Sequence, residues 1–201
     1  ACKVVNPITV CVPASTSNLG SGFDTLSASL SLYLKVRVKI IEGNNIEWVS
    51  GQGPGTIFPT DNNLIERALV ATLKLFGARP PGLMISMENS IPLQRGLGSS
   101  GAAIIAGIKI AESLCEESLS PEAVFELAYP LEGHPDNLAA SLFGGWALSR
   151  VSNGKMYAEK VPSSLSCRFV LAIPEQAVST LEARDILPES YPLSDVVHNL
   201  Q

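Results

Sequence analysis

The chain has 201 residues, of which 46% are hydrophobic and 16% are charged, and its formal net charge is −5. This length holds one full domain and part of another, and the acidic balance argues against a nucleic-acid-binding protein, which needs a basic surface. No apolar run approaches the ~20 residues that span a bilayer and no signal peptide precedes the first strand-like segment, so we expect a cytoplasmic protein with no membrane partner.

The first half of the chain predicts strands separated by turns, followed by one helix. Residues 8–12 are a short β-rich run, and residues 14–24 are rich in turn formers. Residues 33–41 alternate apolar and basic side chains, which predicts a half-buried strand with a solvated face rather than a nucleic-acid patch. Residues 61–63 open a helix that carries apolar residues at helical spacing, and Gly77 is placed to cap its end.

The second half predicts more helix. A buried central helix is expected over residues 102–116, because this segment is apolar on almost every side. Ser120 and Pro121 suit the first positions of another helix, which we expect to run to about Ala128. Further strands are predicted over residues 83–88, 144–150 and 168–173.

Strands and helices are interspersed without the regular βαβ cadence of a doubly wound sheet, which predicts an α+β fold. Glycine, serine, proline and lysine accumulate over residues 151–166 and indicate a weak boundary. We therefore expect one domain over residues 1–155 and the beginning of a second over residues 165–201. The four cysteines show neither a C-x-x-C pair nor a metal-ligand spacing, which favours buried thiols over a disulfide framework.

The most informative stretch is I-P-L-Q-R-G-L-G-S-S-G-A-A-I-I-A-G, residues 91–107, in which a strand, a glycine-rich loop and a helix follow one another. Glycines let the backbone approach a ligand closely, and the first N–H groups of a helix attract anions. The loop therefore predicts a triphosphate site, although it lacks the lysine of the Walker A loop and the acidic partner of the dinucleotide fingerprint. On these residues alone, a Gly/Ser turn that only leads into a buried helix is an equal alternative.

Three motifs, in the same order along the chain, resemble those of the GHMP kinases, the family of galactokinase, homoserine kinase and mevalonate kinase. They are P-A-S-T-S-N-L-G-S-G-F-D at residues 13–24, P-x-x-x-G-L-G-S-S-G-A-A at residues 92–103, and E-G-H-P-D-N-L-A-A-S-L-F-G-G at residues 132–145. The first and third motifs single out the homoserine kinase branch. The resemblance implies the ribosomal-protein-like N-terminal domain of this family, followed by the start of a ferredoxin-like C-terminal domain.

The resemblance also implies that the protein uses ATP and Mg²⁺. Ser99, Ser100 and Glu126 are implied as metal ligands, with Glu132 as the competing carboxylate, because magnesium takes hard oxygen ligands. The alternative for Glu126 is a solvent-facing place on a short helix. Asn63 is also suited to cap the helix that follows it. The residues implied to bind ATP are Asn63, Pro92, Arg95, Gly96, Leu97, Gly98, Ser99, Ser100, Gly101 and Ala102.

At the acceptor end, Asn137 is implied to orient the attacking hydroxyl, and Asp136 resembles the aspartate proposed as a base in other GHMP kinases. In the homoserine kinase branch, metal and phosphate without a base are the alternative. Asp24 suits a substrate ammonium, and the planar fork of Arg184 suits a carboxylate. Turn formation by Asn18 and Asp24, and a surface place for Arg184, are the structural alternatives. The residues implied to bind the substrate are Asn18, Asp24, His134, Thr180 and Arg184.

The expected reaction is ATP-dependent phosphorylation of the side-chain hydroxyl of L-homoserine to O-phospho-L-homoserine, a step toward threonine. A kinase for mevalonate or a sugar, and a non-catalytic relative that binds ligand, are the alternatives. A homodimer is also implied by the family. Ser21 stands where the first motif usually has proline, and Gln201 comes before the third glycine-rich motif of the family. We therefore expect the chain to be part of a longer protein, and an intact mass near 21.3 kDa with full activity would contradict this.

Overall fold

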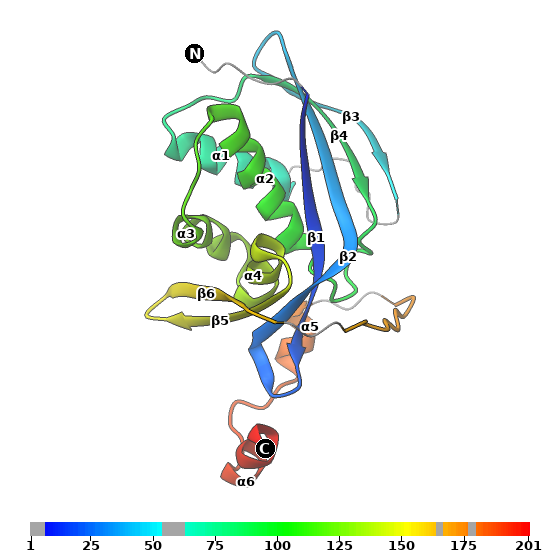
Figure 1. Ribbon diagram of the computed structural model, residues 1–201, viewed down its shortest axis with the longest axis vertical. Helices are drawn as coiled ribbons and strands as arrows, with labels where there is room; N and C mark the ends of the chain where they lie inside the picture. Colours follow the sequence, from blue (N-terminus) through cyan, green and yellow to red (C-terminus); the bar gives the residue numbers. More distant parts are fainter. Residues whose placement is uncertain (1–6, 54–62, 164–166, 177–179) are drawn as a thin grey trace.

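The computed structural model describes residues 7–53, 63–163, 167–176 and 180–201, and within them strands and helices build one mixed layer structure (Figure 1). Six strands form a single sheet in the order β3-β4-β2-β5-β6, and β1 pairs with β2. The β3–β4 pair is parallel and the other pairs are antiparallel. The predicted α+β class is confirmed. The strands are β1 (Ile8–Leu19), β2 (Gly22–Ile41), β3 (Ile46–Gln52), β4 (Gly82–Asn89), β5 (Trp146–Ser152) and β6 (Lys155–Val161).

The first two strands form a long hairpin that contains the segment predicted as a turn-rich loop. β1 continues past Pro13 to Leu19, and β2 begins at Gly22, so the prediction of a loop over residues 14–24 was wrong. Pro13 is tolerated because β1 pairs with β2 alone, and the register shifts between Pro13 and Ala14. Long-range pairing with β2 therefore overrides the local turn preference of this segment.

Four helices cover one face of the sheet (Figure 1): α1 (Leu64–Leu75), α2 (Ser99–Cys115), α3 (Pro121–Glu132) and α4 (Pro135–Phe143). The predicted caps are confirmed, because the Asn63 side chain accepts from two N–H groups of α1 and Ser120 accepts from one N–H group of α3. The helix at residues 135–143 was not predicted. Its first residue is proline and His134 makes no side-chain cap, so the local start signal is weak.

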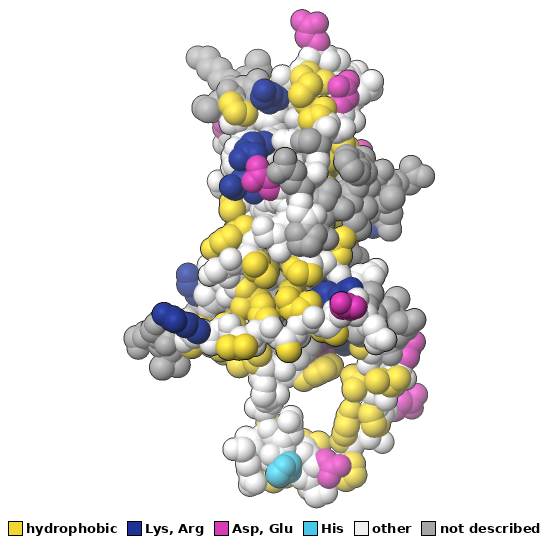
Figure 2. Space-filling view, turned by 90° about the vertical axis from the view of Figure 1, so that its right-hand side faces the viewer, with side chains coloured by type: hydrophobic (Ala, Val, Ile, Leu, Met, Phe, Trp, Pro, Cys, Tyr) yellow, Lys and Arg dark blue, Asp and Glu magenta, His cyan; other side chains and the backbone are white. Residues whose placement is uncertain are grey.

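The core lies between the helices and the sheet, with α2 at its centre as predicted. Gly107 of α2 packs against α1 so closely that a Cβ at this position would lie 2.2 Å from the Ile65 carbonyl oxygen. Val36 and Val38 of β2 are buried against this layer. On the opposite face, Arg37 pairs with Glu88 of β4, and Figure 2 shows basic and acidic side chains next to each other there. The basic residues of β2 therefore mark a solvated sheet face, as the sequence predicted.

The chain beyond the sheet contacts the rest of the molecule sparsely. β6 pairs with β5 up to Val161, so this hairpin crosses the predicted domain boundary at residue 155. The strand predicted over residues 168–173 is absent, because these residues have no strand partner among those described and Val170 is 98% exposed. Two helices follow, α5 (Thr180–Asp185) and α6 (Leu193–Leu200), and α6 buries no residue.

Two remaining expectations concern cysteines and membranes. Cys11, Cys115 and Cys167 form no disulfide with one another, but Cys11 and Cys167 are exposed and Cys115 is half-buried, so the expectation of buried thiols was wrong for these three. Cys2, Asp61 and Asn62 lie outside the described residues. Among the helices that the structure describes, none combines the length and the apolar character needed to cross a membrane.

Candidate active site

The glycine-rich loop ends in an uncapped helix N-terminus. Gly98 occupies the N-cap of α2 with a φ of 66°, a left-handed conformation that favours glycine, and no side chain caps this end of the helix. The first N–H groups of α2 are therefore not satisfied by a capping side chain, and they carry the positive end of the helix dipole. Ser99 and Ser100, both half-buried, form the first turn. This arrangement can bind an anion with backbone donors alone.

A half-buried carboxylate, Glu132, lies directly beside this loop. The Ser100 hydroxyl donates to Oε1 of Glu132, at the end of α3, over 2.6 Å. Burial raises the pKa of Glu132 above its usual value, the hydrogen bond from Ser100 works in the opposite direction, and the charge of Asp136 adds to the rise. The pair therefore presents two hard oxygens next to the helix N-terminus.

Glu126 does not lie at the loop. Its carboxylate is 67% exposed and its Oε1 atom lies 3.8 Å from Nζ of Lys155 on the β5–β6 hairpin. Six residues separate Glu126 from Glu132, which turns their side chains about 120° apart around a helix. The structure therefore brings Glu132, the competing carboxylate, into contact with Ser100, whereas Glu126 lies near Lys155.

The first turn of α4 lies against the glycine loop and the hairpin. The Ser15 hydroxyl donates to Oδ1 of Asn137 over 2.8 Å, and Nδ2 of Asn137 lies 3.3 Å from the Ser17 hydroxyl. Asp136 is buried and accepts from the backbone N–H of Asn137. A Cβ on Gly98 would lie 2.9 Å from Oδ1 of Asn137, so the loop and this amide are in close contact. The structure thus brings Asn137 and Asp136 beside the predicted phosphate loop.

Near the turn between β1 and β2, Asp24 forms an ion pair with Arg184 of α5. Arg184 donates from Nη1 to Oδ2 of Asp24 over 3.0 Å and from Nη2 to Oδ1, across 160 residues of sequence. Its guanidinium also lies over the ring of Phe23, 5.5 Å from the centroid. Asn18 supports the tip, because its Oδ1 accepts from the backbone N–H of Asp24 over 2.8 Å. Asn18 thus has the turn role that was its structural alternative.

His134 links this charged pair to α4. Burial, followed by the positive charge of Arg184, lowers the pKa of His134, and the charges of Asp24 and Asp136 act in the opposite direction. The imidazole is therefore neutral at pH 7, where it can both donate and accept a hydrogen bond. His134 is the N-cap residue of α4, and the charges of Arg184, Asp24 and Asp136 all influence its pKa.

Three predicted site residues, Asn63, Arg95 and Thr180, have no described side-chain contact with the other site residues. The Asn63 side chain is used as the α1 cap. Arg95 donates to the carbonyl oxygens of Leu93 and Gln94 and to those of Pro174 and Glu175, so its guanidinium is committed within the chain. Thr180 is the first residue of α5, and its side chain lies outside the described part.

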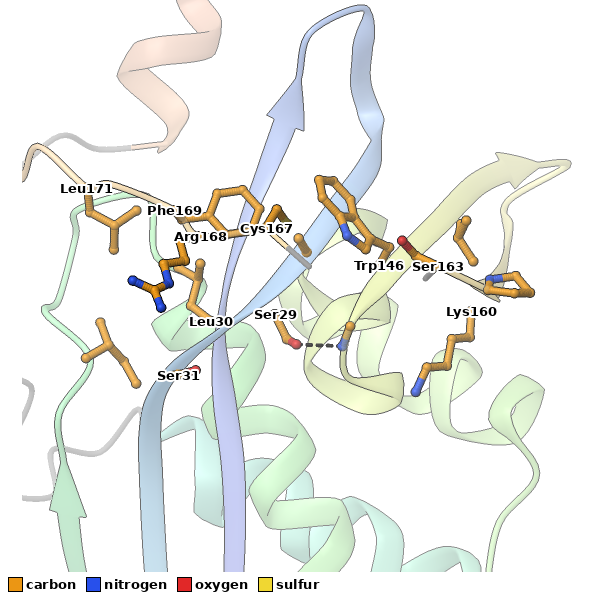
Figure 3. A pocket seen from close by; sticks show the side chains of 15 residues that line it. Ser29, Leu30, Ser31, Trp146, Lys160, Ser163, Cys167, Arg168, Phe169 and Leu171 are labelled. Atoms are coloured by element: carbon orange, nitrogen blue, oxygen red, sulfur yellow. Dashed lines mark hydrogen bonds between the residues drawn. The ribbon is translucent and has the colours of Figure 1, made fainter. Parts of the chain in front are cut away.

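A pocket of about 1160 Å³ lies elsewhere, between the middle of β2, the start of β5 and residues 160–163 and 167–171 (Figure 3). Trp146 and Phe169 line it with aromatic rings, and Lys160 and Arg168 lie toward opposite sides. Among the described residues that line it there is no carboxylate and none of the predicted site residues. The groups that can bind an anion and a cation together are therefore at the glycine loop and not in this pocket.

Sequence reasoning missed two serines of the site. Ser15 and Ser17 belong to the first motif, but nothing in their local pattern distinguishes a buried site residue from a turn former. Only their contacts with Asn137, more than 100 residues away, identify them. The described residues hold no group of three or more His, Cys, Asp or Glu side chains that is suited to a metal ion.

Comparisons with known proteins agree with this geometry. Residues 63–145 match the family model of the GHMP kinases N terminal domain. The chain is 39% identical over 198 residues to a homoserine kinase of Microchaete diplosiphon, covering 98% of this chain and 64% of that protein. It is 41% identical over 189 residues to a homoserine kinase of Thermus thermophilus, covering 94% of this chain and 63% of that protein. The chain thus spans less than two thirds of the length of these curated relatives.

Solved structures show the same fold. A homoserine kinase from Cytophaga hutchinsonii superposes with a TM-score of 0.80 at 27% identity, over 98% of this chain and 64% of that one. The mevalonate kinase of Methanococcus jannaschii superposes with a TM-score of 0.61 at 18% identity, over 79% of this chain and 56% of that one, which shows a shared fold only.

Proposed function

Because this chain belongs to the GHMP kinase family, we propose that it is the nucleotide-binding part of a kinase that phosphorylates the side-chain hydroxyl of L-homoserine. The single observation that carries the proposal is the half-buried Glu132 carboxylate beside the uncapped N-terminus of α2. Phosphoryl transfer needs positioning and charge neutralisation rather than covalent help, and these two features supply sites for an anion and a cation side by side.

The nucleotide end uses backbone donors and hard oxygens. The loop over residues 96–102 is proposed to hold the triphosphate of ATP with its N–H groups. Mg²⁺ keeps several waters and binds through one or two protein oxygens together with phosphates, so the Ser100 hydroxyl and the Glu132 carboxylate fit it without a cluster of three acidic ligands. When bound, the ion would neutralise negative charge on the phosphates.

The acceptor end matches the charges of an α-amino acid. Asp24 carries the charge that an ammonium group needs, and the guanidinium of Arg184 can bind a carboxylate through two parallel hydrogen bonds. In the described chain the two side chains pair with each other, so each satisfies the other in the absence of a zwitterion. A sugar or mevalonate has no ammonium group, and the Asp24 carboxylate then has no cationic partner in the substrate.

Asn137 lies between these two ends. Its amide contacts the glycine loop on one side and the hairpin on the other. This supports a role in orienting the acceptor hydroxyl toward the γ-phosphate. Asp136 is buried next to it and fixes the backbone of Asn137, a role that does not require proton transfer.

The test is turnover by the natural protein with Mg²⁺ and ATP, measured as ADP release against a panel of L-homoserine, mevalonate and a hexose. L-Homoserine should give the highest kcat/KM by at least about tenfold. Preferential turnover of mevalonate or the hexose would reject the substrate, and ATP binding with no transfer to any alcohol would identify a non-catalytic relative.

A further inference from the structure

Ser15 lies where β1, the glycine loop and α4 meet. It is completely buried, its backbone N–H donates to the Leu97 carbonyl oxygen over 3.1 Å, and its hydroxyl donates to Oδ1 of Asn137 over 2.8 Å. A Cβ on Gly98 would lie only 2.0 Å from the Ser15 hydroxyl oxygen. One small residue thus contacts both the loop that is proposed to bind phosphate and the amide that is proposed to orient the acceptor.

The side chains around Asn137 hold its amide in one orientation. With Oδ1 accepting from Ser15, Nδ2 points toward the Ser17 hydroxyl at 3.3 Å and toward Oδ1 of Asp136 at 3.4 Å. In the reversed orientation the amide oxygen would face the buried Asp136 carboxylate, and two acceptors would oppose each other. A hydroxyl can donate or accept, so the carboxylate selects the orientation, and the Ser15 hydroxyl holds the amide oxygen beside the glycine loop.

We propose that Ser15 is a positioning residue, which holds the Asn137 amide at its distance from the glycine loop. This inference rests on the proposed function, because it acts through the amide that orients the acceptor hydroxyl. In this role Ser15 acts through Asn137 and not by its own contact with ATP or the acceptor. Its hydroxyl holds the amide oxygen in place before either ligand binds, which is the preorganisation that in-line transfer requires.

The kinetic test is Ser15→Ala in the natural protein, with Ser27→Ala as the matched control. Ser27 is also a fully buried strand serine, but its hydroxyl contacts the Ala147 carbonyl oxygen and not Asn137. Ser15→Ala should lower kcat between about tenfold and a hundredfold and change the KM for ATP by less than about twofold. Ser27→Ala should leave kcat unchanged. Equal losses in the two variants, or a loss confined to KM for ATP, would overturn the proposal.

A double variant tests whether Ser15 acts through Asn137. If it does, adding Ser15→Ala to Asn137→Ala should lower kcat by no more than about twofold beyond Asn137→Ala alone. Multiplicative losses would show that Ser15 acts independently and would overturn the proposal.

A last measurement requires neither turnover nor a foldable Ser15 variant. In the ¹⁵N-labelled unsubstituted protein, the Asn137 side-chain amide, assigned by its loss in Asn137→Asp, should show nuclear Overhauser contacts to the β-protons of Ser17 and none to those of Ser15. Contacts to Ser15 instead would overturn the proposed orientation. This measurement tests the contact between Ser15 and Oδ1 of Asn137 even if the protein has no kinase activity, so that contact and the proposed function fail separately.

Discussion

Glu132→Gln should make the ligand-free protein more stable and at the same time weaken its response to magnesium. The Glu132 carboxyl is half-buried, and its raised pKa shows that the surroundings favour the neutral form. Glutamine removes the charge and keeps an oxygen that accepts from the Ser100 hydroxyl. The neutral hydrogen bond is weaker by about 1 kcal/mol, but the burial cost and the repulsion from Asp136 disappear as well.

The expected net gain is roughly 1 kcal/mol, because replacing a partly buried charge by a neutral group of the same shape is often stabilising by about that much. For a chain of this size, that gain raises Tm by about 2–4 °C. The sign follows from linkage. The folded pKa of Glu132 lies above the unperturbed value of 4.5, so its favourable contribution is complete below that value and is lost as pH rises through the folded pKa. The stability difference between variant and parent should therefore be small at pH 4 and full at pH 8.

Thermal unfolding between pH 4 and pH 8 measures the change in stability. Titration with a non-hydrolysable ATP analogue, with and without magnesium, measures the change in the response to magnesium. Magnesium should enhance analogue binding by the parent at least about tenfold more than binding by the variant. Glu126→Gln is the matched control, because that carboxylate is exposed and should change neither quantity. A lower Tm for Glu132→Gln at pH 7, or an unchanged magnesium response, would refute the assignment of Glu132.

Three further substitutions test the loop, a cap and the charged pair. Gly98→Ala should lower the free energy of unfolding, measured in urea, by about 2–4 kcal/mol, because this position has a positive φ and a new Cβ would clash with Ser15. Gly20 has a similar φ but open space around it, so Gly20→Ala should lower the same free energy by only about 1 kcal/mol. Asn63→Ala should cost about 1 kcal/mol by the same method, and no change would exclude a capping role. Arg184→Lys should raise the KM for the amino acid at least about tenfold and leave the KM for ATP unchanged, because lysine lacks the planar guanidinium that binds a carboxylate with two hydrogen bonds. Equal increases in both KM values would contradict a carboxylate-binding role for Arg184.

The sequence alone determined those elements that depend only on residues a few positions apart. The caps at Asn63 and Ser120 and the alternation of β2 all depend on neighbours one to four positions away, and the structure confirms them. The glycine loop belongs to this group as well. A residue at Gly98 that must adopt positive φ, followed at once by a helix, produces an uncapped N-terminus in any tertiary setting.

The candidate site required contacts that the sequence does not contain. Glu126 and Glu132 lie on the same helix, and only the packing of α3 determines that Glu132 faces Ser100. Asp24 meets Arg184 across 160 residues, and Ser15 meets Asn137 across 122. Such pairings depend on how the layers pack, which no local preference encodes.

Strands showed the same dependence on tertiary structure. Residues 14–24, rich in turn formers, join β1 and β2 because each strand offers the other a complete hydrogen-bonding edge. Residues 168–173 have strong strand character but form none, because no described strand lies beside them. The sequence alone therefore determined α1, α2 and α3 and the caps at Asn63 and Ser120, and it predicted the glycine loop as an anion site. Tertiary structure decided which strands formed and which charges met, because a strand and an ion pair each require a partner that lies far away along the chain.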